Sequence, residues 1–355
     1  MILINTLAMT LLASNFQSHL VAFQPNLTVG GSSTPVIQEF NGISPGFAFR
    51  EMIASWNVVD PDGAELDIEV RAHLQGKTTK WYTMAEWAID SDSGKRQSVK
   101  GQRDEDGTVD TDTLVLAHDA EQIDARVTLK ATKPGSHSVL KLVTFSFVNK
   151  APLTPDKQVP SSAWGKTVDV PERAQGNYPN GGVLCSPTSM SMMLWHYSKV
   201  LNQPDLNKDV PEVEYHVWDP IYKGAGNWPF NTAYVGSFSG LTSYVTRFTS
   251  IQDLEQWIQA GLPVVCSVSF DLLRGLPLSP TESGHLVVLV GFDDKGNPII
   301  NDPAFKDKVR KIYPRSDFEK AWKYSKRTVY VVHPSDAPIP NALDGAWFSP
   351  SHHQK

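Results

Sequence analysis

Apolar and polar residues alternate with a period of two through much of the first 150 residues. From residue 66 to residue 74 every second position is Leu, Ile, Val or Ala, and the positions between are charged or histidine. The alternation returns between residues 123 and 131. Strands with one face on a core show this pattern. Turn-forming clusters at residues 60–63, 104–107 and 133–135 separate the segments, so we predict an all-β sandwich domain over residues 19–149.

The periodicity is lost between residues 150 and 171, where proline becomes frequent. Such a segment is typical of a linker. We therefore predict a second domain over residues 172–334, followed by an irregular C-terminal tail over residues 335–355.

The second domain is predicted to combine helices with apolar strands. After Cys185, apolar residues recur on one helical face, namely Met190, Met193, Leu194, Tyr197 and Val200. Ser250 and Asp253 have capping-box spacing at the start of a second helix, which Gly261 ends. Both helices are expected to be amphipathic. Apolar runs at residues 262–270, 285–292, 298–301 and 328–332 predict strands that are covered on both faces.

Length and charge narrow the classes of protein. A chain of 355 residues exceeds the size at which one core usually stops growing, which favours two domains. The formal net charge is −6, and no run of Lys or Arg offers a surface for nucleic acid or an anionic membrane. We expect neither partner, and the sequence leaves the oligomeric state open.

The first 18 residues contain an apolar stretch with the length of a signal-peptide core, too short to cross a bilayer. No Lys or Arg precedes it, since the first cationic side chain is Arg50. A signal segment, with a secreted or cell-envelope location, is therefore one interpretation. A truncated start and a first strand are the alternatives, and a cytoplasmic location stays open.

Candidate chemistry begins at Cys185, directly before the predicted helix. The positive end of a helix and a His partner lower the pKa of a thiol, which makes it a nucleophile. Glycines at 181 and 182 would allow the tight bend into the helix, and Pro187 suits its first turn. The alternative is a small buried apolar residue, which describes Cys266 better because Cys266 lies within a Val-rich strand. A disulfide between the two cysteines would abolish the proposed role.

His285 opens an apolar strand, where an imidazole needs a polar partner. Asp302 follows one hairpin later, a spacing that can bring its carboxylate beside the imidazole and fix the tautomer. The alternatives are a hydrogen-bonded core histidine and an ordinary Asp-Pro turn. Gln175 lies in a loop ten residues before Cys185, where its amide could join the Cys185 N–H at an oxyanion, or could simply be solvated.

Residues 171–334 resemble the papain-clan cysteine peptidases related to the bacteriocin-processing, double-glycine leader peptidases, and in particular their stand-alone peptidase-like branch. The matching stretches include Gln175-Gly-Asn-Tyr-Pro-Asn-Gly-Gly-Val-Leu-Cys185-Ser-Pro-Thr-Ser, Gly284-His285-Leu-Val-Val-Leu-Val-Gly-Phe-Asp and Ile300-Asn-Asp302-Pro-Ala. The resemblance implies a papain-like α+β fold. It also implies Cys185 as nucleophile, His285 as general base and acid, Asp302 as orienting residue and Gln175 as oxyanion donor.

The chain departs from the leader peptidases because it lacks the phosphate-binding Gly-x-x-x-x-Gly-Lys-Ser/Thr loop of their export ATPases. Nor does the resemblance reach the first 150 residues. We predict a cysteine peptidase that acts on a peptide or protein substrate through a thioester and needs no metal or organic cofactor. One alternative is an amidase or acyl transferase that acts on cell-wall peptides. The other is an inactive papain-like domain whose sandwich binds glycan or peptide through Trp81, Tyr82 or Trp87.

Overall fold

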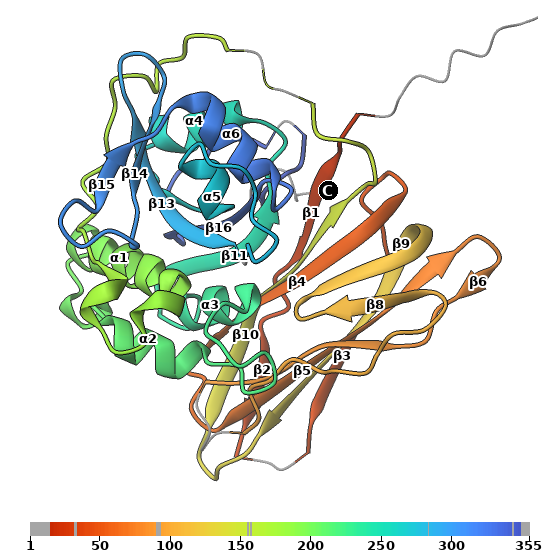
Figure 1. Ribbon diagram of the computed structural model, residues 1–355. Coiled ribbons are helices and arrows are strands. Elements are labelled where there is room, and N and C mark those ends of the chain that lie inside the picture. Colours follow the sequence, from red (N-terminus) through yellow and green to blue (C-terminus); the bar gives the residue numbers. More distant parts are fainter. Residues whose placement is uncertain are drawn as a thin grey trace, which may run out of the picture.

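The computed structural model describes residues 15–31, 34–89, 94–154, 156, 158–282, 284–342 and 344–348. Nearly all of the expected signal segment therefore lies outside the described residues. Figure 1 shows a β-rich N-terminal part beside a part that mixes helices and strands. The expected fold class, a β-rich region followed by an α+β region, is confirmed. The proposed domain boundaries at 149 and 171 remain predictions.

The N-terminal part is a ten-stranded antiparallel sheet with the order β1-β10-β4-β9-β5-β6; β2 pairs with β10, β3 and β8 pair with β9, and β7 pairs with β5. Its strands are β1 (Ser18–Phe23), β2 (Leu27–Gly30), β3 (Val36–Ile43), β4 (Phe49–Val59), β5 (Ala64–Leu74), β6 (Lys77–Thr78), β7 (Tyr82–Ala88), β8 (Gly107–Asp110), β9 (Thr113–Ala131) and β10 (His137–Val148).

Strand β9 joins the two halves of this sheet. Its first residues pair with β4 and β8, whereas its later residues pair with β3 and β5. Side chains from β4 and β10 share one core with those from β5, β7 and β9. The sandwich is thus continuous through β9 and is not built from two separate sheets.

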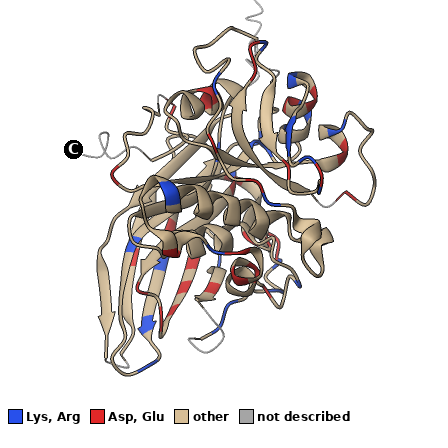
Figure 2. Ribbon diagram, turned by 90° about the vertical axis from the view of Figure 1, so that its left-hand side faces the viewer, with Lys and Arg blue, Asp and Glu red and all other residues tan. Residues whose placement is uncertain are grey.

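Alternation predicts strand β5 correctly, because its residues are buried and half-buried in strict turn from Ala64 to Leu74. The half-buried positions of β5 are charged or histidine, and Figure 2 shows acidic and basic residues along the strands of this sheet. Arg126 lies 3.1 Å from Glu39 and 3.6 Å from Glu69, across neighbouring strands. These pairs are exposed and contribute little to stability, but they keep like charges apart on the solvent face.

The second part contains a six-stranded antiparallel sheet with the order β11-β16-β12-β13-β14-β15. The strands are β11 (Leu241–Arg247), β12 (Val264–Val268), β13 (His285–Phe292), β14 (Pro298–Asn301), β15 (Arg310–Ile312) and β16 (Thr328–Pro334). The helices are α1 (Cys185–Val200), α2 (Val210–Val217), α3 (Trp228–Val235), α4 (Ile251–Gln259), α5 (Phe270–Leu273) and α6 (Arg315–Lys323), with short 3-10 turns η1 (Gln175–Asn177), η2 (Gly181–Val183) and η3 (Pro204–Leu206).

Helices cover both faces of this sheet. Leu286 and Val288 of β13 pack in one core with side chains of α1, α2 and α3, while Val287 and Leu289 pack in the other core with side chains of α4 and α6. Every residue of β13 is consequently buried. The near-continuous apolar pattern of the four predicted strands has its physical cause in this double cover.

The second predicted helix has the expected ends. The Ser250 and Asp253 capping box is present at the start of α4, and Gly261 has a positive φ of 79° just after its end. Helix α1 differs from the expected amphipathic pattern, because it is buried nearly all round and Val200 is 57% exposed. The helix lies between the sheet and helices α2 and α3, so it has almost no solvent face.

The two parts share a polar contact along β4 and β11. The side-chain amide of Asn57 donates to the Ser243 carbonyl at 2.7 Å and accepts from the Ser243 N–H at 3.1 Å. The Val245 N–H donates to the Ser55 hydroxyl at 3.0 Å. The face of β4 that points away from the core of the N-terminal part is therefore buried against β11. These hydrogen bonds hold the two parts together.

The C-terminal residues return to this junction. The described part of the expected tail contains no helix or strand, yet Trp347 and Phe348 are buried. The Leu20 N–H donates to the Gly345 carbonyl at 2.7 Å. These residues pack beside β1 and α4 as part of a core, a position that their sequence pattern does not indicate.

Candidate active site

Cys185 is the first residue of helix α1, where the free N–H groups of the first turn point toward it. The preceding turn is very tight. A Cβ on Gly181 would lie 2.2 Å from the Gln175 carbonyl oxygen, so only glycine fits there. The same close contact holds the Gln175 loop against the start of the helix.

His285 and Asp302 meet as the spacing predicts. His285 opens β13, Asp302 directly follows β14, and the imidazole Nε2 lies 2.7 Å from Asp302 Oδ1. Both side chains are buried. Because Nε2 faces the carboxylate, the other ring nitrogen, Nδ1, remains for the Cys185 thiol.

Two further groups hold the Asp302 carboxylate in place. The Tyr313 hydroxyl donates to Oδ2 at 2.6 Å, and the Ala304 N–H donates to Oδ1 at 3.0 Å. Burial raises the pKa of Asp302, but the hydrogen bond and positive charge of His285, with the bond from Tyr313, lower it below its usual value. Asp302 is therefore an anion able to stabilise an imidazolium.

The thiol and the imidazole favour a charged pair. Burial raises the pKa of Cys185, but the hydrogen bond and charge of His285 outweigh it, so the pKa of the thiol is lowered. Burial lowers the pKa of His285, but the hydrogen bonds that its ring donates to Asp302 and Cys185 outweigh this and raise the pKa. Together these shifts favour a thiolate beside an imidazolium, the reactive state of a nucleophilic cysteine.

Gln175 borders the same cleft as Cys185 and is only 7% exposed. Its backbone N–H donates to the Pro303 carbonyl at 2.9 Å, which ties it to the residue after Asp302. The side-chain Oε1 is buried and has no hydrogen-bond partner among the described residues. This oxygen can accept a hydrogen bond from a ligand, whereas stabilising an oxyanion needs the side-chain NH2 group of Gln175 as donor.

The cleft around these residues has a volume of about 920 Å³. Residues 222–226 and Trp228 line one side, while Phe270, Glu282 and Tyr324 line another. The Phe270 ring lies 4.7 Å from the His285 ring and shields the imidazole from solvent. Cys185 and His285 both line this cleft.

The structure thus brings all four candidate residues, Cys185, His285, Asp302 and Gln175, to one place. Sequence reasoning missed Tyr313 and Phe270, which contact Asp302 and His285. Neither lies in a motif or at a diagnostic spacing. Only the pairing of β14 with β15 carries the chain back so that Tyr313 reaches the carboxylate.

The second cysteine has no part in this arrangement. Cys266 is completely buried in β12, and burial raises the pKa of its thiol. Both cysteines are free. Within the described ranges, no cluster of three or more His, Cys, Asp or Glu has a metal-binding arrangement, and no helix is long and apolar enough to cross a membrane.

Comparison with known proteins gives two family matches. Residues 41–148 match the peptidase C39 N-terminal domain, and residues 167–330 match the peptidase C39-like family. No curated protein matches the chain. A crystal structure assigned to a C39-like peptidase from Bacillus anthracis aligns with 20% identity and a TM-score of 0.36. The alignment covers 48% of this chain and 99% of that one. The two family matches span most of the chain, which therefore belongs to the C39 peptidase-like proteins of the papain clan and has a cysteine-peptidase-like fold.

Proposed function

We propose that the protein is a cysteine peptidase that hydrolyses peptide bonds through Cys185, His285 and Asp302. The observation that carries this proposal is the hydrogen bond of 2.7 Å between His285 and Asp302, beside a thiol whose pKa the imidazole lowers. A core histidine would need no such nucleophile next to it in an open cleft.

The reaction would begin as the Cys185 sulfur bonds to the scissile carbonyl carbon. The carbonyl oxygen becomes an oxyanion, which the Cys185 N–H and the Gln175 amide would stabilise. His285 then transfers its proton to the leaving amine, and the C–N bond breaks to leave a thioester. Water, deprotonated by His285, attacks the thioester and releases the new carboxylate and the thiol.

The competing interpretation, a binding protein with exposed sandwich aromatics, finds little support. Tyr82 and Trp87 are completely buried. The guanidinium groups of Arg71 and Arg126 lie 4.7 and 4.5 Å from the Trp81 ring and occupy its faces. None of the three offers an open stacking surface to a sugar.

The proposal is tested by incubating a complex peptide mixture with the protein in water enriched in ¹⁸O. A peptidase produces new C-termini that contain ¹⁸O, and the Cys185→Ala variant produces none. An acyl transferase would instead join the new carbonyl to an added amine, without the label. Equal products from both proteins, or none from either, would contradict the proposal.

A further inference from the structure

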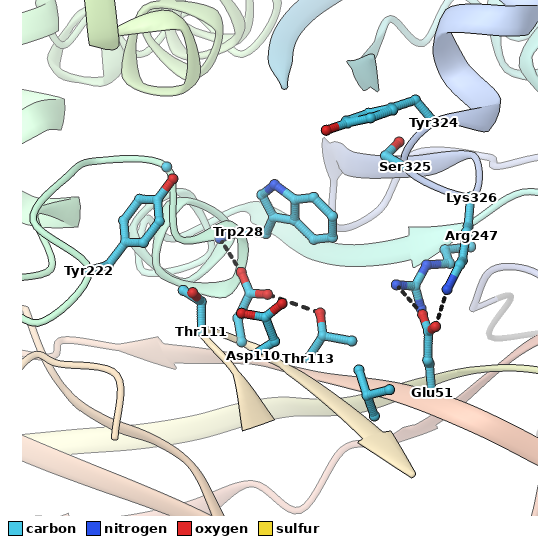
Figure 3. Close-up of a pocket in the computed structure, with 13 residues that line it drawn as sticks. Glu51, Asp110, Thr111, Thr113, Tyr222, Trp228, Arg247, Tyr324, Ser325 and Lys326 are labelled. Carbon is cyan, nitrogen blue, oxygen red and sulfur yellow. Dashed lines mark hydrogen bonds and ion pairs between the residues drawn. The ribbon is translucent and has the colours of Figure 1, made fainter. Parts of the chain in front are cut away.

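A crevice of about 340 Å³ lies between the N-terminal sheet and the catalytic part (Figure 3). The turn between β8 and β9, residues 110–113, forms its N-terminal wall. Five residues line both this crevice and the catalytic cleft, namely Tyr222, Gly226, Trp228, Tyr324 and Ser325. The two spaces therefore adjoin, and a chain bound at Cys185 can continue into the crevice.

Aromatic residues line the shared passage. Tyr222 is 46% exposed, Tyr324 is 43% exposed, and the half-buried Trp228 lies between them in Figure 3. Burial raises the pKa of Tyr222, and so do the nearby negative charges of Asp112 and Cys185. Tyr222 is thus close to both the hairpin turn and the nucleophile. Rigid aromatic surfaces of this kind bind an extended peptide at low entropic cost.

The carboxylates that line the crevice differ in whether they have partners within the protein. Asp112 accepts hydrogen bonds from the Trp228 N–H at 2.8 Å and the Thr113 hydroxyl at 3.0 Å. Glu51 pairs with both Arg247 and Lys326. Asp110 is exposed, and its carboxylate has no hydrogen-bond or ion-pair partner within the described part of the chain. Asp110 is therefore the carboxylate that remains for a ligand.

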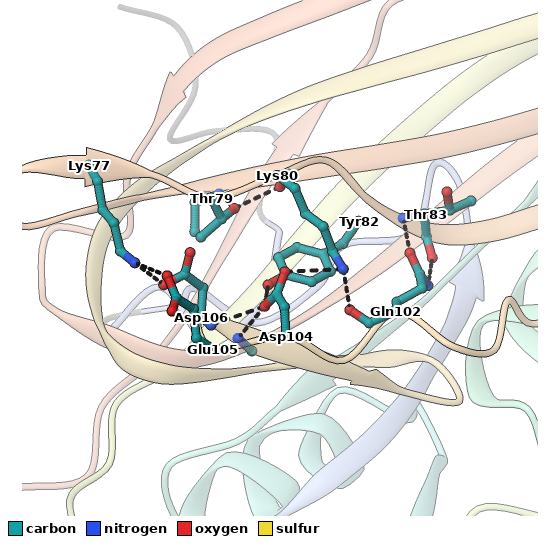
Figure 4. Close-up of polar contacts among 11 residues, drawn as sticks. Lys77, Thr79, Lys80, Tyr82, Thr83, Gln102, Asp104, Glu105 and Asp106 are labelled. Atoms are coloured by element: carbon teal, nitrogen blue, oxygen red, sulfur yellow. Dashed lines mark hydrogen bonds and ion pairs between the residues drawn. The ribbon is translucent and has the colours of Figure 1, made fainter.

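Polar contacts connect the hairpin that carries Asp110 to the neighbouring strand β7. Thr111 has a φ of 58°, a left-handed conformation that is costly for a β-branched residue. At the base of the hairpin, Asp104 accepts from the Tyr82 hydroxyl at 2.6 Å and from the Gly107 N–H at 3.0 Å (Figure 4). Lys80 lies 3.1 Å from the same carboxylate. These contacts hold the backbone of the hairpin beside the crevice.

We propose that the substrate peptide runs from the catalytic cleft past Trp228 into the crevice, where Asp110 binds a cationic side chain of the peptide. The N-terminal domain then helps to select the substrate. This inference rests on the proposed peptidase function, because it names the substrate class of the same site.

Binding to the full-length Cys185→Ala variant tests this inference without turnover. Fluorescent alanine-rich hexapeptides carry a single Lys, norleucine or Glu at each position in turn, and fluorescence anisotropy gives the dissociation constants. At one position, Lys should bind about five-fold more tightly than norleucine, the range of a partly exposed ion pair. Asp110→Asn should remove this preference. Asp205→Asn should keep it, because Asp205 is exposed but lines neither space.

Three outcomes would overturn the inference. The first is no preference at any position, including undetectable binding of every peptide, and the second is a Lys preference that survives Asp110→Asn. The third is a preference for Glu, which would assign recognition to Lys326 or Arg247. Failure of the peptidase function is read separately, from hydrolysis by the wild-type chain. Binding with a Lys preference but without hydrolysis would support the crevice and refute the catalytic proposal.

Discussion

The contact between Tyr313 and Asp302 gives the sharpest prediction about the site. Tyr313→Phe removes one hydroxyl and leaves the ring in place. Asp302 is completely buried, and its Oδ2 then loses the donor that lies 2.6 Å away. Hydrogen bonds to charged groups contribute about 1.5–3 kcal/mol, so we expect the free energy of unfolding to fall by about 2 kcal/mol at pH 7.

The effect should depend on pH in a definite direction. The pKa of Asp302 is lowered from 3.8 in the folded protein. Its stabilising contribution is therefore complete above the unfolded value and is lost as the pH falls through the folded value. The cost of Tyr313→Phe should accordingly shrink as the pH is lowered from 7 to 3, below the unfolded value of 3.8 and toward the lowered folded pKa.

Tyr197→Phe is the matched control. Tyr197 is also buried, but its hydroxyl donates to the neutral Val332 carbonyl at 2.8 Å. We expect it to cost about 1 kcal/mol at both pH values and to leave the thiol unchanged. The free energy of unfolding of both variants is measured in urea, and alkylation of Cys185 is a second readout. If both variants lose the same stability at both pH values, Tyr313 does not support a buried carboxylate.

Two further predictions concern the turn before Cys185 and the junction of the two parts. Gly181→Ala should lower the free energy of unfolding in urea by about 2 kcal/mol, because its Cβ would meet the Gln175 carbonyl. Gly182→Ala is the control: its Cβ would have no atom within 4 Å and should change the free energy by less than about 0.5 kcal/mol. Equal effects of the two substitutions would contradict the close contact. Burial raises the pKa of Asp112 from 3.8 to about 6, so its charge costs stability above that range. Asp112→Asn keeps an acceptor for the Trp228 N–H. It should stabilise the protein by at most about 3 kcal/mol at pH 8 and have little effect near pH 4. The same gain at both pH values would contradict the raised pKa of Asp112.

The sequence predicts those features that a short stretch determines. Strand β5 follows from alternation alone, and β13 follows from its apolar run because helices cover both faces. The meeting of His285 and Asp302 is also predictable, since one hairpin joins them and strand pairing limits where they can lie.

Features that depend on packing between distant segments could not be predicted in this way. The nearly complete burial of α1 results from its place between the sheet and two other helices, which its own spacing does not encode. Asp110 lies in a hairpin turn whose sequence indicates only a turn. Its relation to Trp228 arises because β4 packs on β11 and brings the two parts together.

The pH dependence of Cys185 alkylation shows whether His285 activates the thiol. Wild-type protein and His285→Ala are treated with iodoacetamide between pH 5 and pH 9, and mass spectrometry locates the adduct. We expect wild-type Cys185 to react as a thiolate well below the usual thiol pKa of about 8.5, and His285→Ala to lose this reactivity at low pH. Wild-type Cys185 that titrates like a free thiol, or that reacts equally after loss of the imidazole, would contradict an activated cysteine.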